Sequence, residues 1–283
     1  MRNLRTSLFV LTLLLVTLCA AMAANAPFFF VHITDPQLGF TTSNKDMVAE
    51  IEHFTKAVEH INRLKPAFVL ITGDLTNAKR DPKQVREFYR IASEINPDIP
   101  LKLLPGNHDV GNAPTAADIV GYRKIFGKDY YSFSYNGAQF IAINGCLLGN
   151  GADEAYREEQ RKWLVETLES ARASKPTHIF VCMHQPFFLN KADEPDRYQN
   201  VPLALRTEYL QLMNRYGVDY AISGHLHHEQ SATCGGMTLV TSGALSKSEG
   251  EPPDVGFRIW KVYPDRVEHE FYTLDKVPQS VKL

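Results

Sequence analysis

Short apolar runs alternate with longer amphipathic stretches through the first part of the chain. The apolar runs predict buried strands, and the stretches with apolar residues at helical spacing predict helices. We expect strands at 28–34, 67–72 and 99–104, and helices at 46–64, 83–95 and 116–126. Such alternation is typical of an α/β fold.

The pattern changes after residue 130. Two strand-like segments, 131–135 and 138–144, flank Asn136-Gly137, which is a strong β-hairpin signal. Helices are then expected at 154–173 and 203–216, strands at 178–184 and 218–223, and several short strands within 229–274. We therefore predict a four-layer α/β/β/α sandwich, in which two mixed sheets pack face to face with helices outside. Because no linker or repeat interrupts it, residues 27–276 are expected to form a single domain.

The first residues differ from the rest of the chain. Arg2 and Arg5 precede an apolar run at 8–20, and small residues follow at 21–23. This pattern predicts a secretory signal peptide over residues 1–23, cleaved near Ala23. The competing interpretation, an uncleaved membrane anchor, needs ~20 apolar residues, which is longer than this run. We expect a secreted or periplasmic protein with no membrane span after cleavage.

Composition limits the remaining function classes. A formal net charge of −2 gives no electrostatic reason to expect nucleic-acid binding, and no basic patch is evident in the sequence. The exported part keeps Cys146, Cys182 and Cys234, too few for a disulfide scaffold, so at most one bridge is expected. Cys182 lies inside an apolar run and is expected to be a buried, inert thiol.

Polar residues that can bind metals stand where the predicted strands end. Each fragment alone has an ordinary explanation as a turn or a surface group. Together they supply carboxylates, amides and imidazoles at the strand ends, where ligands collect in open α/β sheets. The fragments are Asp35-Pro36-Gln37, Gly73-Asp74, Gly106-Asn107-His108-Asp109, His184 and Gly224-His225-Leu226-His227. We expect the two histidines of the last fragment to point to the same side of an extended segment. The set is sufficient for two metal ions that share Asp74.

This ordered set of fragments resembles the calcineurin-like metallophosphoesterase superfamily. Within it, the chain looks closest to the calcineurin-like phosphoesterase domain-containing group, described as serine/threonine phosphatases. Asp-Pro-Gln at residues 35–37, the segment 129–133 before the hairpin and the acidic loop 193–198 carry that closer similarity. The resemblance implies that Asp35, Gln37, Asp74 and His227 hold one metal, and that Asp74, Asn107, His184 and His225 hold the other.

The resemblance also implies that His108 faces the substrate. An imidazole there can stabilise developing charge and protonate the departing alkoxide. Because neighbouring side chains diverge in an extended turn, His108 is not expected to bind metal if Asn107 does. Asp109 is a candidate catalytic group that holds a ring or loop in place, although a helix or turn cap is an equally ordinary role for it.

Gln37 stands where most members of the superfamily have histidine. An amide oxygen is a harder ligand than an imidazole, and it favours Mn, Mg or Fe over Zn in that half of the site. The sequence leaves three roles open for Gln37: direct ligand, ligand through water, or a residue outside the ligand set. The cofactors are therefore expected to be two divalent or trivalent ions, Mn, Fe, Zn or Mg.

Two cations about 3.5–4 Å apart would lower the pKa of a bridging water and clamp the phosphoryl oxygens, so that hydroxide attacks phosphorus. We therefore expect an exported, dimetal-dependent hydrolase of phosphoesters, with a phosphomonoesterase favoured. The alternatives are a phosphodiesterase acting on nucleotides or lipid head groups, and a metal-binding module without turnover.

Substrate choice is expected to depend on the long polar loop 185–200, which directly follows His184 and would form a rim of the site. Its Asp193, Glu194 and Asp196 would repel an anionic substrate unless they face away. Arg197 and Tyr198 are candidate phosphate contacts. Phe187 and Phe188 suit either an organic group of the substrate or, more commonly, core packing under the loop.

Overall fold

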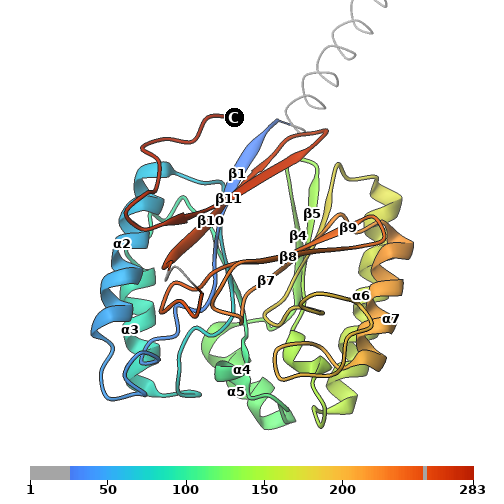
Figure 1. The fold of residues 1–283 in the computed structure, drawn as a ribbon, viewed down its shortest axis with the longest axis horizontal. Coiled ribbons are helices and arrows are strands. Elements are labelled where there is room, and N and C mark those ends of the chain that lie inside the picture. The colour runs from blue at the N-terminus through green and yellow to red at the C-terminus, as the bar shows by residue number, and fades with distance from the viewer. Residues whose placement is uncertain (1–25, 251–253) are drawn as a thin grey trace, which may run out of the picture.

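The computed structural model describes residues 26–250 and 254–283. Figure 1 shows two sheets in the middle of the molecule, with helices on the left and on the right. This is the predicted α/β/β/α sandwich. The predicted signal peptide at 1–23 lies outside the described residues, and the single-domain assignment of 27–276 stays a prediction.

The first sheet has five strands and combines parallel and antiparallel pairs. Its order is β11-β10-β1-β2-β3, and it consists of β1 (Phe28–Ile33), β2 (Val69–Thr72), β3 (Leu101–Leu104), β10 (Gly256–Val262) and β11 (Val267–Thr273). The three N-terminal strands run parallel, whereas β10 and β11 are antiparallel to their neighbours. Val31, for example, pairs with Val69 of β2 on one side and with Ile259 of β10 on the other.

The second sheet has six strands. In the order β4-β5-β6-β7-β9-β8, its members are β4 (Tyr131–Tyr135), β5 (Ala138–Ala142), β6 (Ile179–Cys182), β7 (Tyr220–Ser223), β8 (Gln230–Cys234) and β9 (Met237–Thr241). Strands β5, β6, β7 and β9 run parallel, and β4 and β8 close the two edges in antiparallel pairs. Asn136 and Gly137 both have positive φ, as a two-residue hairpin turn requires, and the predicted hairpin is confirmed.

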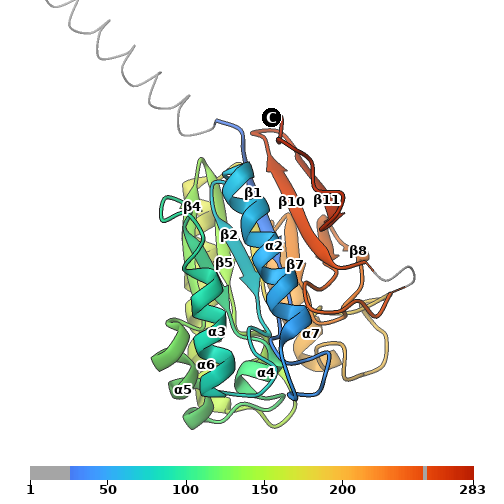
Figure 2. The ribbon, with the colours of Figure 1, turned by 90° about the vertical axis from the view of Figure 1, so that its left-hand side faces the viewer.

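Each sheet carries a pair of helices on its outer face, as the turned view in Figure 2 shows for α2 and α3. These helices are α2 (Val48–Leu64) and α3 (Pro82–Ala92) on the first sheet, and α6 (Glu154–Ser174) and α7 (Leu203–Tyr216) on the second. Phe54 of α2 packs in one cluster with Val31 and Ile71, and Leu164 of α6 packs in another with Val181. The helix pairs therefore supply the two outer hydrophobic cores.

Three further short elements lie near the ends of the strands. They are α4 (Asn107–Val110), α5 (Ala116–Phe126) and the 3-10 helix η1 (Gly145–Leu148). The segment 107–110 was expected to be an extended turn, and that prediction is wrong: it forms one turn of helix. The Asp109 carboxylate accepts a hydrogen bond from the Gly106 N–H, so the aspartate within the segment caps its own helix start.

Aromatic side chains fill the space between the two sheets. Phe30 is fully buried there, with ring centroids 4.8 Å from Phe68 and 5.8 Å from Trp260. Phe140 meets the Phe30 ring edge-on from the opposite sheet, at 5.4 Å. Since packed aromatic pairs contribute beyond their buried area, this central layer fixes how the sheets face each other.

We expect Phe30→Ala to lower the free energy of unfolding by about 3–5 kcal/mol, because it removes a buried ring and leaves a cavity between the sheets. Urea unfolding followed by circular dichroism measures the change. Val120→Ala on the exposed face of α5 is the control, since Val120 is 54% exposed and should change stability by less than about 0.5 kcal/mol. Equal effects of the two substitutions would contradict the assigned core.

The remaining structural expectations concern thiols and membranes. Cys146, Cys182 and Cys234 are all free thiols, so none of the three is bridged. Cys182 is buried, as predicted, and burial raises the pKa of its thiol. Within the described residues, every helix is too short or too polar to cross a lipid bilayer.

Candidate metal centre

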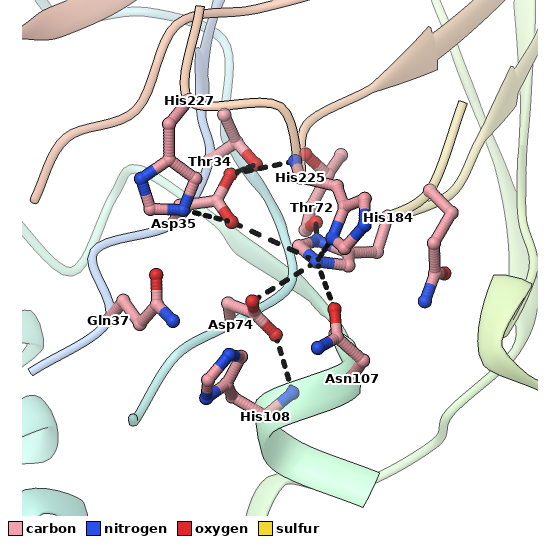
Figure 3. Close-up of polar contacts among 12 residues, drawn as sticks. Thr34, Asp35, Gln37, Thr72, Asp74, Asn107, His108, His184, His225 and His227 are labelled. Atoms are coloured by element: carbon pink, nitrogen blue, oxygen red, sulfur yellow. Dashed lines mark hydrogen bonds and ion pairs between the residues drawn. The ribbon is translucent and has the colours of Figure 1, made fainter. Parts of the chain in front are cut away.

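The predicted site residues converge at one edge of the sandwich, where parallel strands of both sheets end (Figure 3). The first sheet contributes five of them, from the segments that follow β1, β2 and β3: Asp35, Gln37, Asp74, Asn107 and His108. The second sheet contributes three, from the segments that follow β6 and β7: His184, His225 and His227. The site therefore depends on the way the two sheets face each other.

His184 lies at the centre of the cluster. Its Nε2 is 3.2 Å from Asp74 Oδ2, 3.1 Å from Asn107 Oδ1 and 3.2 Å from His225 Nδ1. One ligand atom each from Asp74, His184 and His225 lie within 4.8 Å of one another. A carboxylate, an amide oxygen and two imidazoles at these separations could hold a metal ion.

A second group of donors surrounds Asp35. Its Oδ1 is 3.4 Å from His227 Nε2 and 3.8 Å from His184 Nε2. Its Oδ2 accepts hydrogen bonds from the Thr34 hydroxyl and from the His225 N–H, which fix the carboxylate. This group could hold a second cation, and His184 and Asp74 connect it to the first.

Three histidines of the site are oriented by backbone carbonyls. In each of them Nδ1 donates a hydrogen bond to a carbonyl oxygen, which leaves Nε2 as the nitrogen available to the site. The carbonyls belong to Thr72 for His184, to Lys247 for His227 and to Asn77 for His108, each at 2.8 Å. Thr72, Asn77 and Lys247 could not be identified from the sequence, because a carbonyl oxygen is present in every residue and gives no side-chain signal.

Several polar atoms of the site are buried without a hydrogen-bond partner among the described residues. They are Asp35 Oδ1, Gln37 Oε1 and His225 Nε2. Unpaired buried polar atoms are costly and rare, and each of these three can offer a lone pair. Donors of this kind that lie together in a buried cluster fit cations, so the residues present suit the metal ions that the sequence predicts.

The charges of the cluster also favour a cation. Burial alone would raise the pKa of Asp35, but the charges of His227 and His184 outweigh burial and hold that pKa below its usual range. Burial opposes a charge on His184, yet Asp74 and Asp35 raise the pKa of its imidazole to about 9. Desolvation of the ring and the charge of His184 lower the pKa of His225, a half-buried residue, to about 4. The negative charges of Asp35 and Asp74 thus favour positive charge at this point of the cluster.

The loops after β2 and β3 approach each other closely. Gly73 has φ +96°, and a Cβ there would lie 2.6 Å from the Gly106 nitrogen and 2.7 Å from His184 Nδ1. Only glycine satisfies both the backbone angle and the spacing. This contact allows Asp74 Oδ1 to accept a hydrogen bond from the His108 N–H at 2.8 Å.

Backbone angles in the left-handed region are concentrated at the site. Of the eleven described residues other than glycine with positive φ, five belong to the predicted set: Asp35, Gln37, Asp74, His225 and His227. Such angles cost energy, and they persist where surrounding structure enforces them, often at functional sites. The sequence offers no direct signal for them.

The expectation that His225 and His227 lie on an extended segment is wrong. Their φ values are 73° and 55°, and the loop after β7 is bent. His225 Nδ1 lies by His184, whereas His227 Nε2 lies by Asp35. The bend therefore directs the two imidazoles to different parts of the cluster.

His108 sits in the first turn of α4, not in an extended turn. Successive helical side chains diverge by about 100°, so Asn107 and His108 still point in different directions. The Asn107 side chain contacts His184, while the His108 ring is held by Asn77 and has no described partner on Nε2. The ring nitrogen of His108 is thus free to contact another group.

Asp109 is buried, and its carboxylate is bound by backbone N–H groups and by the Thr76 hydroxyl. Its carboxylate accepts from Gly106 at 2.9 Å, from Leu75 at 3.1 Å and from Thr76 at 3.2 Å. Burial and the charge of Asp74 raise its pKa to about 7. Asp109 therefore caps α4 and also holds the loop that carries Asp74, which combines the two structural roles considered for it.

Comparisons with known proteins agree with this geometry. The calcineurin-like phosphoesterase family matches residues 30–229. The serine/threonine-protein phosphatase CPPED1 of Rattus norvegicus is 34% identical over 269 residues, which cover 89% of this chain and 86% of the relative. The CPPED1 protein of Homo sapiens is 32% identical and covers 90% of this chain and 87% of its own length.

Solved structures share the fold. A dimetal phosphatase from Danio rerio has a TM-score of 0.67 at 14% identity and covers 87% of this chain and 96% of its own. A purple acid phosphatase from yellow lupin has a TM-score of 0.67 at 17% identity, and the match covers 89% of this chain and 52% of the lupin chain. At these identities the likeness supports the two-sheet architecture alone.

Proposed function

Since this chain belongs to the calcineurin-like phosphoesterase family and is a metallophosphoesterase, we propose that it is a phosphatase that hydrolyses phosphomonoesters with two metal ions. The observation that carries the proposal is the cluster of donors contributed by both sheets, three of whose buried polar atoms have no hydrogen-bond partner among the described residues. Its similarity to phosphatases named for serine and threonine supports the monoester over the diester.

The proposed ligand sets follow the two groups of donors. Asp35, Gln37, Asp74 and His227 would hold one ion. The other would be held by Asp74, Asn107, His184 and His225. When bound, two such ions neutralise phosphoryl charge and make a water acidic enough to attack near neutral pH. The protein's part is to fix the donors, through the carbonyl contacts of the histidines and the backbone contacts of Asp35 and Asp74.

In this proposal His108 is the proton donor to the leaving group. Its Nδ1 is committed to the Asn77 carbonyl, so Nε2 carries the exchangeable proton. Because its backbone N–H is bound to Asp74, the ring stays close to the metal donors without being one of them. It can therefore protonate the departing alkoxide while the ligand set stays intact.

The proposed activity is tested with two nitrophenyl substrates in the presence of Mn²⁺. Para-nitrophenyl phosphate should be hydrolysed with a higher kcat/KM than bis-(para-nitrophenyl) phosphate. A strong preference for the bis-ester would favour the phosphodiesterase alternative instead. If the protein with two bound metals cleaved no phosphoester of a broad panel, it would be a metal-binding module without turnover.

We also propose direct binding of metal through Gln37, whose buried Oε1 has no partner among the described residues. Gln37→Ala should lower the affinity for one of the two metal ions by about 10–100-fold and leave the affinity for the other unchanged. Titration with Mn²⁺ by calorimetry measures both affinities. Gln84→Ala is the control, because Gln84 is a buried glutamine on α3 outside the ligand set. Two unchanged affinities in Gln37→Ala would rule out direct ligation.

Export of the protein is a further part of the proposal. It is supported by Arg2 and Arg5, by the apolar run that follows them and by the small residues at 21–23. The intact mass of protein recovered from the medium or periplasm tests this: it should correspond to a chain that begins just after Ala23 or Ala24. A full-length chain in the cytosol would contradict it.

A further inference from the structure

Tyr198 lies against the proposed metal ligands, although it comes from the loop between β6 and α7. Its hydroxyl oxygen accepts a hydrogen bond from Asn107 Nδ2 at 3.1 Å, and its ring centroid is 5.1 Å from that of His225. Since Asn107 is the donor in this contact, the hydroxyl proton of Tyr198 remains free to donate. The residue is nevertheless 60% exposed, so a ligand can reach it.

The loop that carries Tyr198 is fixed from inside by Glu194. The Glu194 carboxylate accepts backbone hydrogen bonds from residues 189, 190 and 191 and a side-chain bond from Asn200. These bonds outweigh burial and lower its pKa to about 2. Asp196 accepts from the Leu203 N–H at the start of α7. Glu194 and Asp196 are therefore held by hydrogen bonds within the loop.

The two phenylalanines of the loop serve the core. Phe187 and Phe188 are buried with the residues that pack against the second sheet. Of the two roles considered for them, core packing under the loop is therefore the observed one. With Phe187 and Phe188 packed in the core and with Glu194 and Asp196 bound, the loop holds Tyr198 against the cluster.

A cavity of about 210 Å³ opens next to Tyr198. Its polar side chains include Asn112, Asn150, Gln185 and Arg197, and no carboxylate lines it among the described residues. Asn112, Asn150 and the Arg197 guanidinium make no side-chain hydrogen bond with other described residues, so they are available to a ligand. At ~30 Å³ per water molecule, the volume corresponds to roughly seven waters, which suits only a small group.

We propose that this cavity is the leaving-group subsite of the phosphatase, and that it selects phosphoesters of small polar alcohols. Tyr198 lies between the cavity and the metal ligands Asn107 and His225. Its hydroxyl group donates a hydrogen bond to a phosphoryl oxygen of the substrate. Asn112 and Asn150 bind the hydroxyl groups of the alcohol, because carboxamides both donate and accept hydrogen bonds. The inference rests on the proposed function, since it assigns the organic part of the same substrate.

The subsite is tested by comparing glycerol 3-phosphate with methyl phosphate, which carries the same phosphoryl group but nothing to fill the cavity. In the wild type with Mn²⁺, kcat/KM should be about tenfold higher for glycerol 3-phosphate, as one or two hydrogen bonds would give. Asn112→Leu and Asn150→Leu should each remove most of this preference and leave methyl phosphate unchanged. The assignment would be overturned if the wild type had nearly equal kcat/KM for the two substrates. It would also be overturned if the asparagine variants lost kcat/KM equally on both.

Tyr198 is tested with Tyr198→Phe, which keeps the ring on His225 and removes the hydroxyl. We expect kcat to fall about 10–100-fold on both substrates at saturating Mn²⁺, with bound metal unchanged by mass spectrometry. The matched control, Tyr135→Phe on β4, should have wild-type kcat. If Tyr198→Phe instead weakened metal binding and kept kcat at saturating metal, Tyr198 would only support Asn107, and the proposed contact with substrate would be wrong.

These outcomes are distinct from failure of the proposed function. A wild-type protein that hydrolyses neither ester nor any other phosphoester would remove the phosphatase proposal itself. A wild-type protein that hydrolyses both, with Tyr198 and the two asparagines having no effect, would remove only the subsite.

Discussion

Asp74→Asn is expected to empty both metal positions and to lower turnover by about 10³-fold or more. The carboxylate is buried, with Oδ1 bound to the His108 N–H and Oδ2 3.2 Å from His184 Nε2, so both oxygens lie within the cluster. Asparagine keeps the shape but loses the negative charge and one acceptor. Since Asp74 is the one carboxylate proposed for both ions, its neutralisation affects both.

Metal content by mass spectrometry and kcat on para-nitrophenyl phosphate measure the effect of Asp74→Asn. Asp193→Asn is the matched control, because it makes the same change on an exposed residue of the rim loop. We expect this control to bind two ions and to keep wild-type turnover. A normal metal count in Asp74→Asn would refute the bridging assignment.

His108→Ala is expected to lower kcat by about 10²–10⁴-fold while both metal ions stay bound. The ring is held by Asn77 and is not among the proposed ligands, so its removal should leave the donors in position. The loss should be larger for an alkyl phosphate than for para-nitrophenyl phosphate, because nitrophenolate departs without a proton. This dependence on the leaving group distinguishes a proton donor from a residue that only binds phosphate.

Kinetics on both esters, together with metal analysis, measure the effect of His108→Ala. His60→Ala on α2 is the control, since His60 is bound to the Leu274 carbonyl away from the cluster. Wild-type kcat in His108→Ala would show that the assigned proton donor is wrong. An equal loss on both esters would assign His108 to charge stabilisation instead.

Periodicity and turn chemistry were sufficient to predict most of the fold. The helices at 116–126 and 203–216 have the predicted bounds, and the hairpin at Asn136-Gly137 lies where expected, because apolar spacing and turn residues act locally. Helix α4 could not be predicted, because no capping residue precedes it in the sequence: Asp109, within the helix, binds the Gly106 N–H. One turn of helix is too short to produce a periodic signal.

The residues of the cluster could be named from the sequence, but their arrangement could not. Donors at strand ends follow from topology, because parallel strands of both sheets end at the same edge. The left-handed angles at His225 and His227 depend on contacts with distant segments, such as the bond from the His227 ring to the Lys247 carbonyl. A pattern read from neighbouring residues therefore placed the two histidines on one extended segment, which the tertiary contacts exclude.

The division of the donors between the two sheets has a consequence for synthesis of the chain. A polypeptide that has been translated only as far as β5 carries Asp35, Asp74 and Asn107, but none of the three imidazoles proposed as ligands. The last of these, His227, follows four-fifths of the sequence. On this assignment, a fragment that ends before His227 is expected to lack hydrolytic activity.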